Sequence, residues 1–142
     1  MPDQAEENLA TRLATQVVER LHARDLDGLA GLFDEQVLRI DHRRGITAPD
    51  IKGREAYAAY MEASLAAGMV SGAVTPVVTY GDRHALITGR WGNGDGMHVD
   101  FLMAIVTNEA GQALYMGHFD PEDEASALED VRVRYADTSD SR

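Results

Sequence analysis

The sequence predicts an α+β domain, in which most helices come first and an antiparallel sheet follows. Within residues 6–33 and 54–67, apolar residues recur at intervals of three and four, as on the buried faces of amphipathic helices. From Ser71 onward, β-branched runs alternate with short segments rich in Gly, Asp and Asn, which is typical of strands joined by hairpins. Helices that precede such a sheet cover one of its faces.

Two helices are expected at the start of the chain. Within residues 6–23 an apolar residue recurs every fourth position from Leu9 to Leu21, which places one apolar stripe along a helix. Asp25 can cap a second, shorter helix, because its carboxylate can accept hydrogen bonds from the free N–H groups of the first turn. The apolar residues of this second helix are Leu26, Leu29, Leu32 and Phe33.

The middle of the chain predicts one strand and a third helix. Residues 36–45 alternate as a strand and lead into a loop. Gly53 precedes a helix over residues 54–67. Its buried stripe consists of Tyr57, Met61 and Leu65.

Four strands are expected after that helix, at residues 72–80, 83–92, 96–107 and 112–119. Short polar segments link them as hairpins. Pro76 cannot donate a hydrogen bond to a neighbouring strand, so the first of the four is predicted to lie at an edge of the sheet.

A short fourth helix is expected after the sheet, with Asp120 as its cap and Pro121 at its first position. The chain, residues 1–142, is expected to form one domain with a body over about residues 6–131. The first five residues and the tail from about residue 135 are expected to be flexible.

Composition excludes several classes of function. The net charge of −11 opposes binding to nucleic acid and to anionic membranes, since few basic residues are available to neutralise phosphates. The chain has no cysteine and therefore no disulfide or thiolate metal site. No apolar run is long enough to span a bilayer, and the acidic first ten residues do not resemble a secretion signal, so a cytoplasmic protein is expected. No phosphate-binding or dinucleotide-binding motif is present, and no cofactor is expected.

The segment MHVDFLMAIV, residues 97–106, begins an otherwise apolar strand with an imidazole and a carboxylate. Because strand side chains alternate, His98 and Asp100 share one face, while Phe101 and the other odd-numbered residues form a second, wholly apolar face. That second face is too apolar to stand in water. We therefore expect it to pack on another copy of the chain, in a homodimer formed through the sheet.

Pairing with the neighbouring strand brings further polar residues to the face of Asp100. A turn centred on Gly94 sets Thr88 opposite Asp100 and places Arg90 beside His98. If this face lines a pocket, the predicted ligand-binding residues are Leu86, Thr88, Arg90, His98, Leu102, Tyr115 and Phe119, together with Tyr57 of the third helix. A metal site from His98 and Asp100 is an alternative, but spacing fixes no third ligand and no metal is predicted.

Four segments carry a resemblance that spans residues 6–120. They are ARDLDGLAGLFDE, VLRIDHR, KGREAYAAYMEASL and VDFLMAIVTNEAGQALYMGHFD, in this order along the chain. In order and spacing the chain resembles the nuclear transport factor 2-like superfamily, and within it the SnoaL-like and ketosteroid-isomerase-like proteins. The resemblance implies a cone-shaped, curved antiparallel sheet wrapped around the N-terminal helices, with an apolar cavity inside and commonly a homodimer.

The resemblance also implies a pair of catalytic carboxyl groups. Asp41 in RIDHR matches the general base of ketosteroid isomerases, and Asp100 in HVDF matches their protonated, oxyanion-binding Asp. The oxyanion-binding Tyr of that family has no counterpart here, since by spacing from Asp41 the matching position is Val17 or its neighbour. If Arg90 lies beside Asp100, it keeps this carboxylate ionised, which is similar to the Asp and Arg arrangement of limonene epoxide hydrolases.

Two classes of function follow from this interpretation. The first is cofactor-free acid/base catalysis of the isomerase, cyclase, dehydratase or epoxide-hydrolase type on an apolar, oxygenated small molecule. The alternative is a non-catalytic module of the same fold that senses a ligand or dimerises.

Overall fold

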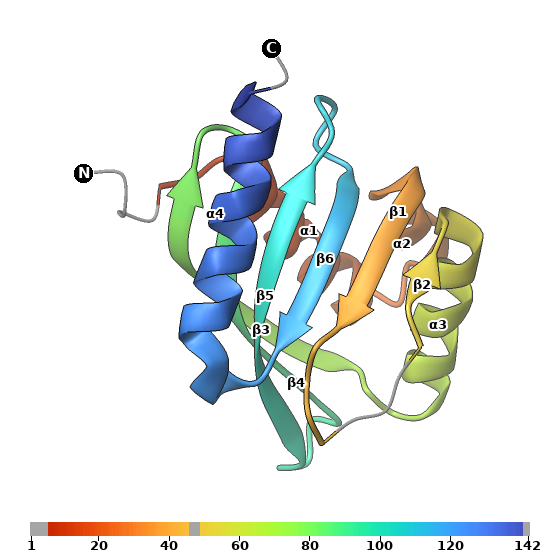
Figure 1. The fold of residues 1–142 in the computed structure, drawn as a ribbon. Helices are drawn as coiled ribbons and strands as arrows, with labels where there is room; N and C mark the ends of the chain where they lie inside the picture. Colours follow the sequence, from red (N-terminus) through yellow and green to blue (C-terminus); the bar gives the residue numbers. More distant parts are fainter. Residues whose placement is uncertain (1–5, 46–48, 141–142) are drawn as a thin grey trace.

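A computed structural model describes residues 6–45 and 49–140 of the chain (Figure 1). The elements are α1 (Leu9–His22), α2 (Leu26–Ala30), β1 (Phe33–Asp41), β2 (Ile51–Lys52), α3 (Arg54–Ala66), β3 (Ser71–Tyr80), β4 (His84–Gly92), β5 (His98–Thr107), β6 (Ala113–Phe119), the 3-10 turn η1 (Pro121–Asp123) and α4 (Glu124–Asp140). The α+β prediction is confirmed. None of the described helices is both long and apolar enough to cross a membrane. The first five residues, predicted to be flexible, lie outside the described part.

The six strands form one sheet in the order β2-β1-β6-β5-β4-β3. The four predicted strands from β3 to β6 form an antiparallel meander, and β3, which contains Pro76, lies at an edge as expected. Two features were not predicted. β1 pairs in parallel with β6, so the sheet is mixed, and the two-residue strand β2 forms the opposite edge.

The first three helices cover one face of the sheet (Figure 1). Asn8 caps α1 by accepting a hydrogen bond from the backbone N–H of Thr11, and its side-chain amide donates to the backbone carbonyls of Gly81 and His84. The cap thereby fastens the start of α1 to the turn between β3 and β4. Asp25 caps α2 as predicted.

The other face of the sheet is covered by α4, which lies across the front of the strands in Figure 1. The sequence predicts a short helix and a frayed tail, but α4 continues to Asp140. Its Ala127 and Val131 are fully buried against the sheet. The Tyr115 hydroxyl donates to the Asp130 carboxylate at 2.6 Å, and the Arg134 guanidinium lies 3.5 Å from the centre of the Tyr115 ring. Within the predicted tail, the Tyr135 ring stacks on Tyr80, and the Thr138 hydroxyl donates to the backbone carbonyl of Arg134.

The two faces of β5 have the residues that alternation predicts, but their roles are reversed. The odd-numbered face, with Phe101, Met103 and Ile105, packs towards the first three helices inside the molecule. The prediction that this face contacts a second copy of the chain is therefore wrong. The physical reason is that both faces of the sheet are covered within one chain. α4 packs on the even-numbered face and the first three helices pack on the odd-numbered face, so neither needs a partner.

The register of the β4–β5 hairpin is shifted by two residues from the prediction. Asp100 lies opposite Arg90 and not opposite Thr88, and Leu102 lies opposite Thr88. A shift of two keeps every side chain on its predicted face. The error lies in which face is the interior.

Burial of α4 against the sheet predicts a large difference between two valines of that helix. Val131→Asp buries a carboxylate with no partner and should lower the free energy of unfolding by about 3 kcal/mol or more, measured by urea denaturation. Val133 is 46% exposed on the same helix. The matched control Val133→Asp should change the free energy of unfolding by no more than about 0.5 kcal/mol. Equal effects of the two substitutions would contradict the packing of α4 on the sheet.

Candidate functional site

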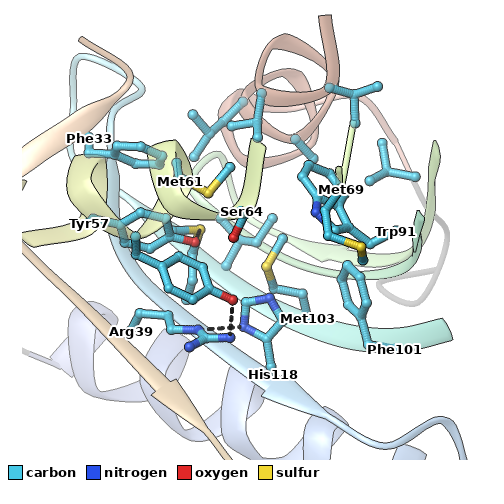
Figure 2. Close-up of a pocket in the computed structure, with 18 of the residues that line it drawn as sticks. Phe33, Arg39, Tyr57, Met61, Ser64, Met69, Trp91, Phe101, Met103 and His118 are labelled. Atoms are coloured by element: carbon cyan, nitrogen blue, oxygen red, sulfur yellow. Dashed lines mark hydrogen bonds between the residues drawn. The ribbon is translucent and has the colours of Figure 1, made fainter. Parts of the chain in front are cut away.

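A cavity of about 240 Å³ lies between the sheet and the first and third helices. Most of its wall is apolar, with side chains from α1, β1, α3, β5 and β6 such as Leu13, Val17, Phe33, Met61, Met103 and Met116. Figure 2 shows Trp91 and Phe101 on one side of the cavity and Tyr57 and Arg39 on the other. The cavity is thus an apolar chamber with polar groups gathered at one end, an arrangement typical of small-molecule sites.

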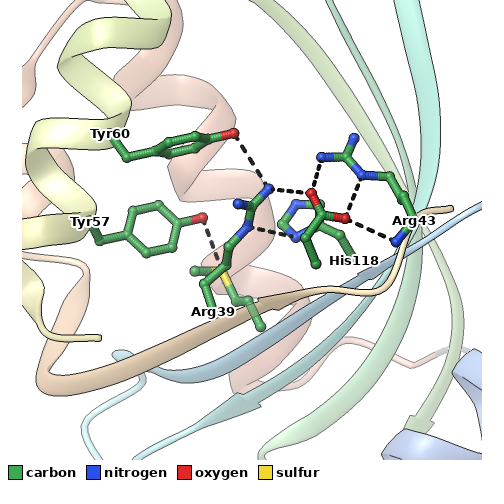
Figure 3. A network of polar contacts seen from close by, with 7 residues as sticks. Arg39, Arg43, Tyr57, Tyr60 and His118 are labelled. Carbon is green, nitrogen blue, oxygen red and sulfur yellow. Dashed lines mark hydrogen bonds and ion pairs between the residues drawn. The ribbon is translucent and has the colours of Figure 1, made fainter. Parts of the chain in front are cut away.

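The polar end is built from β1, the segment after it, α3 and β6 (Figure 3). Its side chains are Arg39, Arg43, Tyr57, Tyr60 and His118. Arg39 and His118 reach the cavity because β1 and β6 are parallel neighbours, with Arg39 opposite Met116 and Asp41 opposite His118. Tyr57 and Tyr60 lie one helical turn apart, so both face β1.

Asp41 joins two guanidinium groups behind the cavity wall. Its fully buried carboxylate accepts hydrogen bonds from Arg43 at 2.8 Å (Nε to Oδ1) and 2.6 Å (Nη2 to Oδ2), and from Arg39 Nη2 at 3.3 Å. Burial alone would raise the pKa of Asp41, but the hydrogen bonds and positive charges of Arg43 and Arg39 outweigh it and hold the pKa below its ordinary value. Asp41 is therefore a fixed anion that orients the two arginines.

His118 is a neutral imidazole in one defined tautomer. Burial, together with the positive charges of Arg39 and Arg43, lowers the pKa of His118 to about 3. Its Nδ1 lies 3.3 Å from Arg39 Nε, which can only donate, so Nδ1 is the acceptor and the proton resides on Nε2. No hydrogen-bond partner for this Nε2–H is found within the described part of the chain. A free N–H donor is thus left beside the cavity.

Two more donors at this end have no strong acceptor. Arg39 is only 1% exposed, and its Nη1 is buried without a partner among the described residues. The buried Tyr57 hydroxyl is 3.9 Å from the sulfur of Met116, a weak acceptor. Burial raises the pKa of Tyr57 above its ordinary value, so the phenol keeps its proton. An unpaired buried donor is costly, and a ligand oxygen would remove that cost.

Most of the residues predicted to form the pocket lie elsewhere. Of the predicted ligand-binding set only Tyr57 lines the cavity. The side chains buried beneath α4, on the opposite face of the sheet, are Leu86, Leu102, Tyr115 and Phe119. The side chains exposed on that face, beyond the end of the α4 contact, are Thr88, Arg90, His98 and Asp100.

The predicted pair of catalytic carboxyl groups is not formed. Asp41 lies on the cavity face of the sheet, whereas Asp100 lies on the α4 face with its side chain 48% exposed. Arg90 Nε is 2.8 Å from Asp100 Oδ1, and this hydrogen bond holds the pKa of Asp100 below its ordinary value. Asp100 is therefore an ionised surface residue and not a protonated donor in a pocket. Within the described residues no three His, Asp or Glu side chains come together as metal ligands.

The sequence did not predict Arg39, Arg43 and His118 as site residues, although Arg43 is close enough to Asp41 in the sequence to be its ion-pair partner, which it is. One signal for Arg39 was present, since it is a charged residue between Leu38 and Ile40 within a strand. Alternation places it on the same face as Asp41, so a buried ion pair was a possible reading. His118 lies opposite Met103, on the face where the sequence predicts a partner chain and which is in fact the wall of the cavity.

No protein-family model matches the sequence, and no curated protein matches it. Solved structures do match. The protein RV0760c from Mycobacterium tuberculosis, in complex with estradiol-17beta-hemisuccinate, is 20% identical with a TM-score of 0.60, over 79% of this chain and 93% of that one. A computationally designed 17-OHP binder is 17% identical with a TM-score of 0.62, over 83% of this chain and 95% of that one.

A third solved structure is a protein of Kribbella flavida described as a ketosteroid isomerase. It is 18% identical with a TM-score of 0.61, over 78% of this chain and 76% of that one. The chain thus has the nuclear transport factor 2-like cone fold of the ketosteroid isomerase-like proteins, as the resemblance in its sequence implies.

Two buried imidazoles predict a loss of stability in mild acid. Burial lowers the pKa of His84 to about 4, and that of His118 to about 3. As the pH falls below about 6.5, the unfolded chain binds protons at both residues while the folded chain does not. The free energy of unfolding should therefore fall by about 1.4 kcal/mol per pH unit for each imidazole between pH 6.5 and pH 4, in urea denaturation at a series of pH values. These groups add no slope above that window.

NMR provides an independent check of the same prediction. The ring nitrogens of His118 should report a neutral imidazole with its proton on Nε2, unchanged from about pH 7.5 to about pH 5. Titration of His118 in this range would contradict the buried, arginine-flanked environment.

The role of Asp41 predicts a second difference in stability. Asp41→Asn leaves two buried guanidinium groups without their anion and should lower the free energy of unfolding by about 3 kcal/mol. The matched control Asp100→Asn breaks an exposed ion pair with Arg90 and should change stability little. Urea denaturation of both variants is the measurement. If Asp41→Asn leaves the free energy of unfolding unchanged, the carboxylate does not organise the polar end.

Proposed function

We propose that the chain is a binding protein for an apolar small molecule, which occupies the cavity and places an oxygen function at its polar end. The observation that carries the proposal is the wall itself: an apolar chamber that ends at a buried, unpaired donor of Arg39, a Tyr57 hydroxyl with only a weak acceptor, and the free N–H of His118. Burial of an apolar body supplies affinity, and the donors fix its orientation. The steroid complex of RV0760c and the designed 17-OHP binder support a ligand of this kind, since they share the fold.

Proton-transfer catalysis is the second candidate, and the cavity gives it less support than binding. A general base must be able to accept a proton near the working pH. The described residues that line the cavity include no carboxylate. Asp41 is held ionised by two arginines, and the pKa of His118 is about 3, so both are weak bases. A binding or sensing role therefore fits the polar end better than an isomerase role does.

A cavity-filling substitution tests where the ligand binds. Ser64 lines the cavity from α3, whereas its neighbour Ala63 is exposed. The neutral probe N-phenyl-1-naphthylamine becomes fluorescent in apolar surroundings and should bind the wild-type chain and quench Trp91, the only tryptophan and itself part of the wall. Ser64→Phe should weaken this binding by about 10-fold or more, because the added ring takes the place of the probe. Ala63→Phe should leave it unchanged.

The outcome that contradicts the proposal is probe binding that both variants leave intact, or no binding to the wild type at all. Incubation with a β,γ-unsaturated ketosteroid separates binding from turnover. We expect the steroid to displace the probe without forming the conjugated enone, and rapid formation of the enone would favour the isomerase alternative.

A further inference from the structure

We infer that the natural ligand of the cavity is an acid, in which an apolar body ends in a carboxylate or a similar anionic group. The inference rests on the proposed binding function and names its ligand class. It depends on the net charge of the polar end and on the direction of its free donors.

The first argument is the charge of the cavity wall. Arg39 and Arg43 both line the cavity, and Asp41 supplies a single negative charge between them. His118 is neutral, so it does not alter the sum. The polar end therefore carries one uncompensated positive charge in an apolar chamber. A buried charge without a partner is unfavourable, and a monoanionic ligand would compensate it.

Neighbouring acidic groups outside the wall do not take this role. Asp120 lies close enough to raise the pKa of Arg43, but its carboxylate accepts a hydrogen bond from the backbone N–H of Arg44 at an exposed position. Asp123 is paired with the exposed Arg44 side chain. Both carboxylates lie in the described part of the chain, and neither lines the cavity or accepts a hydrogen bond from Arg39 or Arg43.

The second argument is the chemistry of the unpaired atoms. Arg39 Nη1, the Tyr57 hydroxyl and His118 Nε2–H can all donate. The raised pKa of Tyr57 keeps the phenol protonated, and the hydrogen bond from Arg39 to Nδ1 places the imidazole proton on Nε2. The acceptors at this end are the phenol oxygens of Tyr57 and Tyr60, and that of Tyr60 already accepts a hydrogen bond from Arg39. A carboxylate offers only acceptors and about four lone-pair sites, so it matches such a set more fully than a ketone or an alcohol does.

The third argument is that the arginines are held in place before any ligand binds. Arg39 donates to Asp41 and His118, and its guanidinium carbon lies 4.8 Å from the centre of the Tyr60 ring. Arg43 is held by two hydrogen bonds to the Asp41 carboxylate. An anion therefore meets fixed donors and does not need to order flexible side chains, which lowers the entropic cost of its binding.

Two dyes with nearly the same apolar body test the charge preference. The anion 8-anilino-1-naphthalenesulfonate and the neutral N-phenyl-1-naphthylamine differ by one acidic group, and both report binding by fluorescence. The wild-type chain should bind the anion about 10- to 100-fold more tightly than the neutral dye. Arg39→Gln should lower the ratio of the two affinities to about 3-fold or less.

Two further variants serve as controls. Arg90→Gln removes a guanidinium from the exposed face of the sheet, with the same change in net charge, and should retain the preference. Arg39→Lys keeps the charge but loses the planar donor pair, and should retain part of it. If Arg39→Gln does not fold, the ratio of the two affinities in the wild type and in Arg39→Lys still decides the question.

The outcomes separate this inference from the proposed function. Equal binding of the two dyes by the wild type, or a preference that Arg39→Gln and Arg90→Gln alter equally, overturns the inference and leaves the proposed function standing. Failure of both dyes to bind overturns both. Displacement of the anionic dye by estradiol-17beta-hemisuccinate, but not by estradiol at the same concentration, would extend the support from a sulfonate to a carboxylate.

Discussion

The polar end of the cavity depends on one carboxylate that holds two arginines. Asp41 accepts hydrogen bonds from both Arg43 and Arg39, and Arg39 then directs its Nε–H at His118. The tautomer of the imidazole and the direction of its free N–H follow from that contact. A buried ion pair adds little net stability by itself, since desolvation offsets the attraction. Its value here is geometric, because it determines which atoms a ligand would meet.

The position of α4 explains why the cavity lies on one side of the sheet only. Residues on the even-numbered face of β5, from Leu102 to Val106, are buried beneath this helix and cannot form a cavity wall. Where the helix no longer covers the strand, the side chains become polar, as with the exposed ion pair of Arg90 and Asp100. The imidazole and carboxylate at the start of β5 thus mark the edge of the α4 contact and not the edge of a site.

Much of the fold could be predicted from the sequence, because alternation, helical spacing and caps are local properties. Pro76 indicated an edge strand, and Asp25 indicated a helix start; both are confirmed. The candidate site could not be predicted in the same way. Alternation separates the faces of β5 but does not say which face is the interior, and that depends on where α4 packs after the chain has folded back. An apolar face that lines a cavity and one that contacts a partner have the same sequence pattern.

The parallel pairing of β1 with β6 had no local signal either, although it brings Arg39 and His118 together. Residues far apart in the sequence meet there only through the order of strands in the sheet. The position of Asp41 in the sequence suggested a general base. Arg39 and Arg43 keep its carboxylate ionised, so Asp41 instead holds these two arginines in place.

The two edges of the sheet have a consequence for how copies of the chain can associate. One edge is β2, which has only two residues, and the other is β3, in which Pro76 removes a backbone donor and the register shifts beside it. Short strands and interrupted ladders are poor templates for the addition of another strand. Extended, fibril-like growth by edge-to-edge pairing is therefore disfavoured, and any assembly of this chain would have to use side-chain contacts rather than a continued sheet.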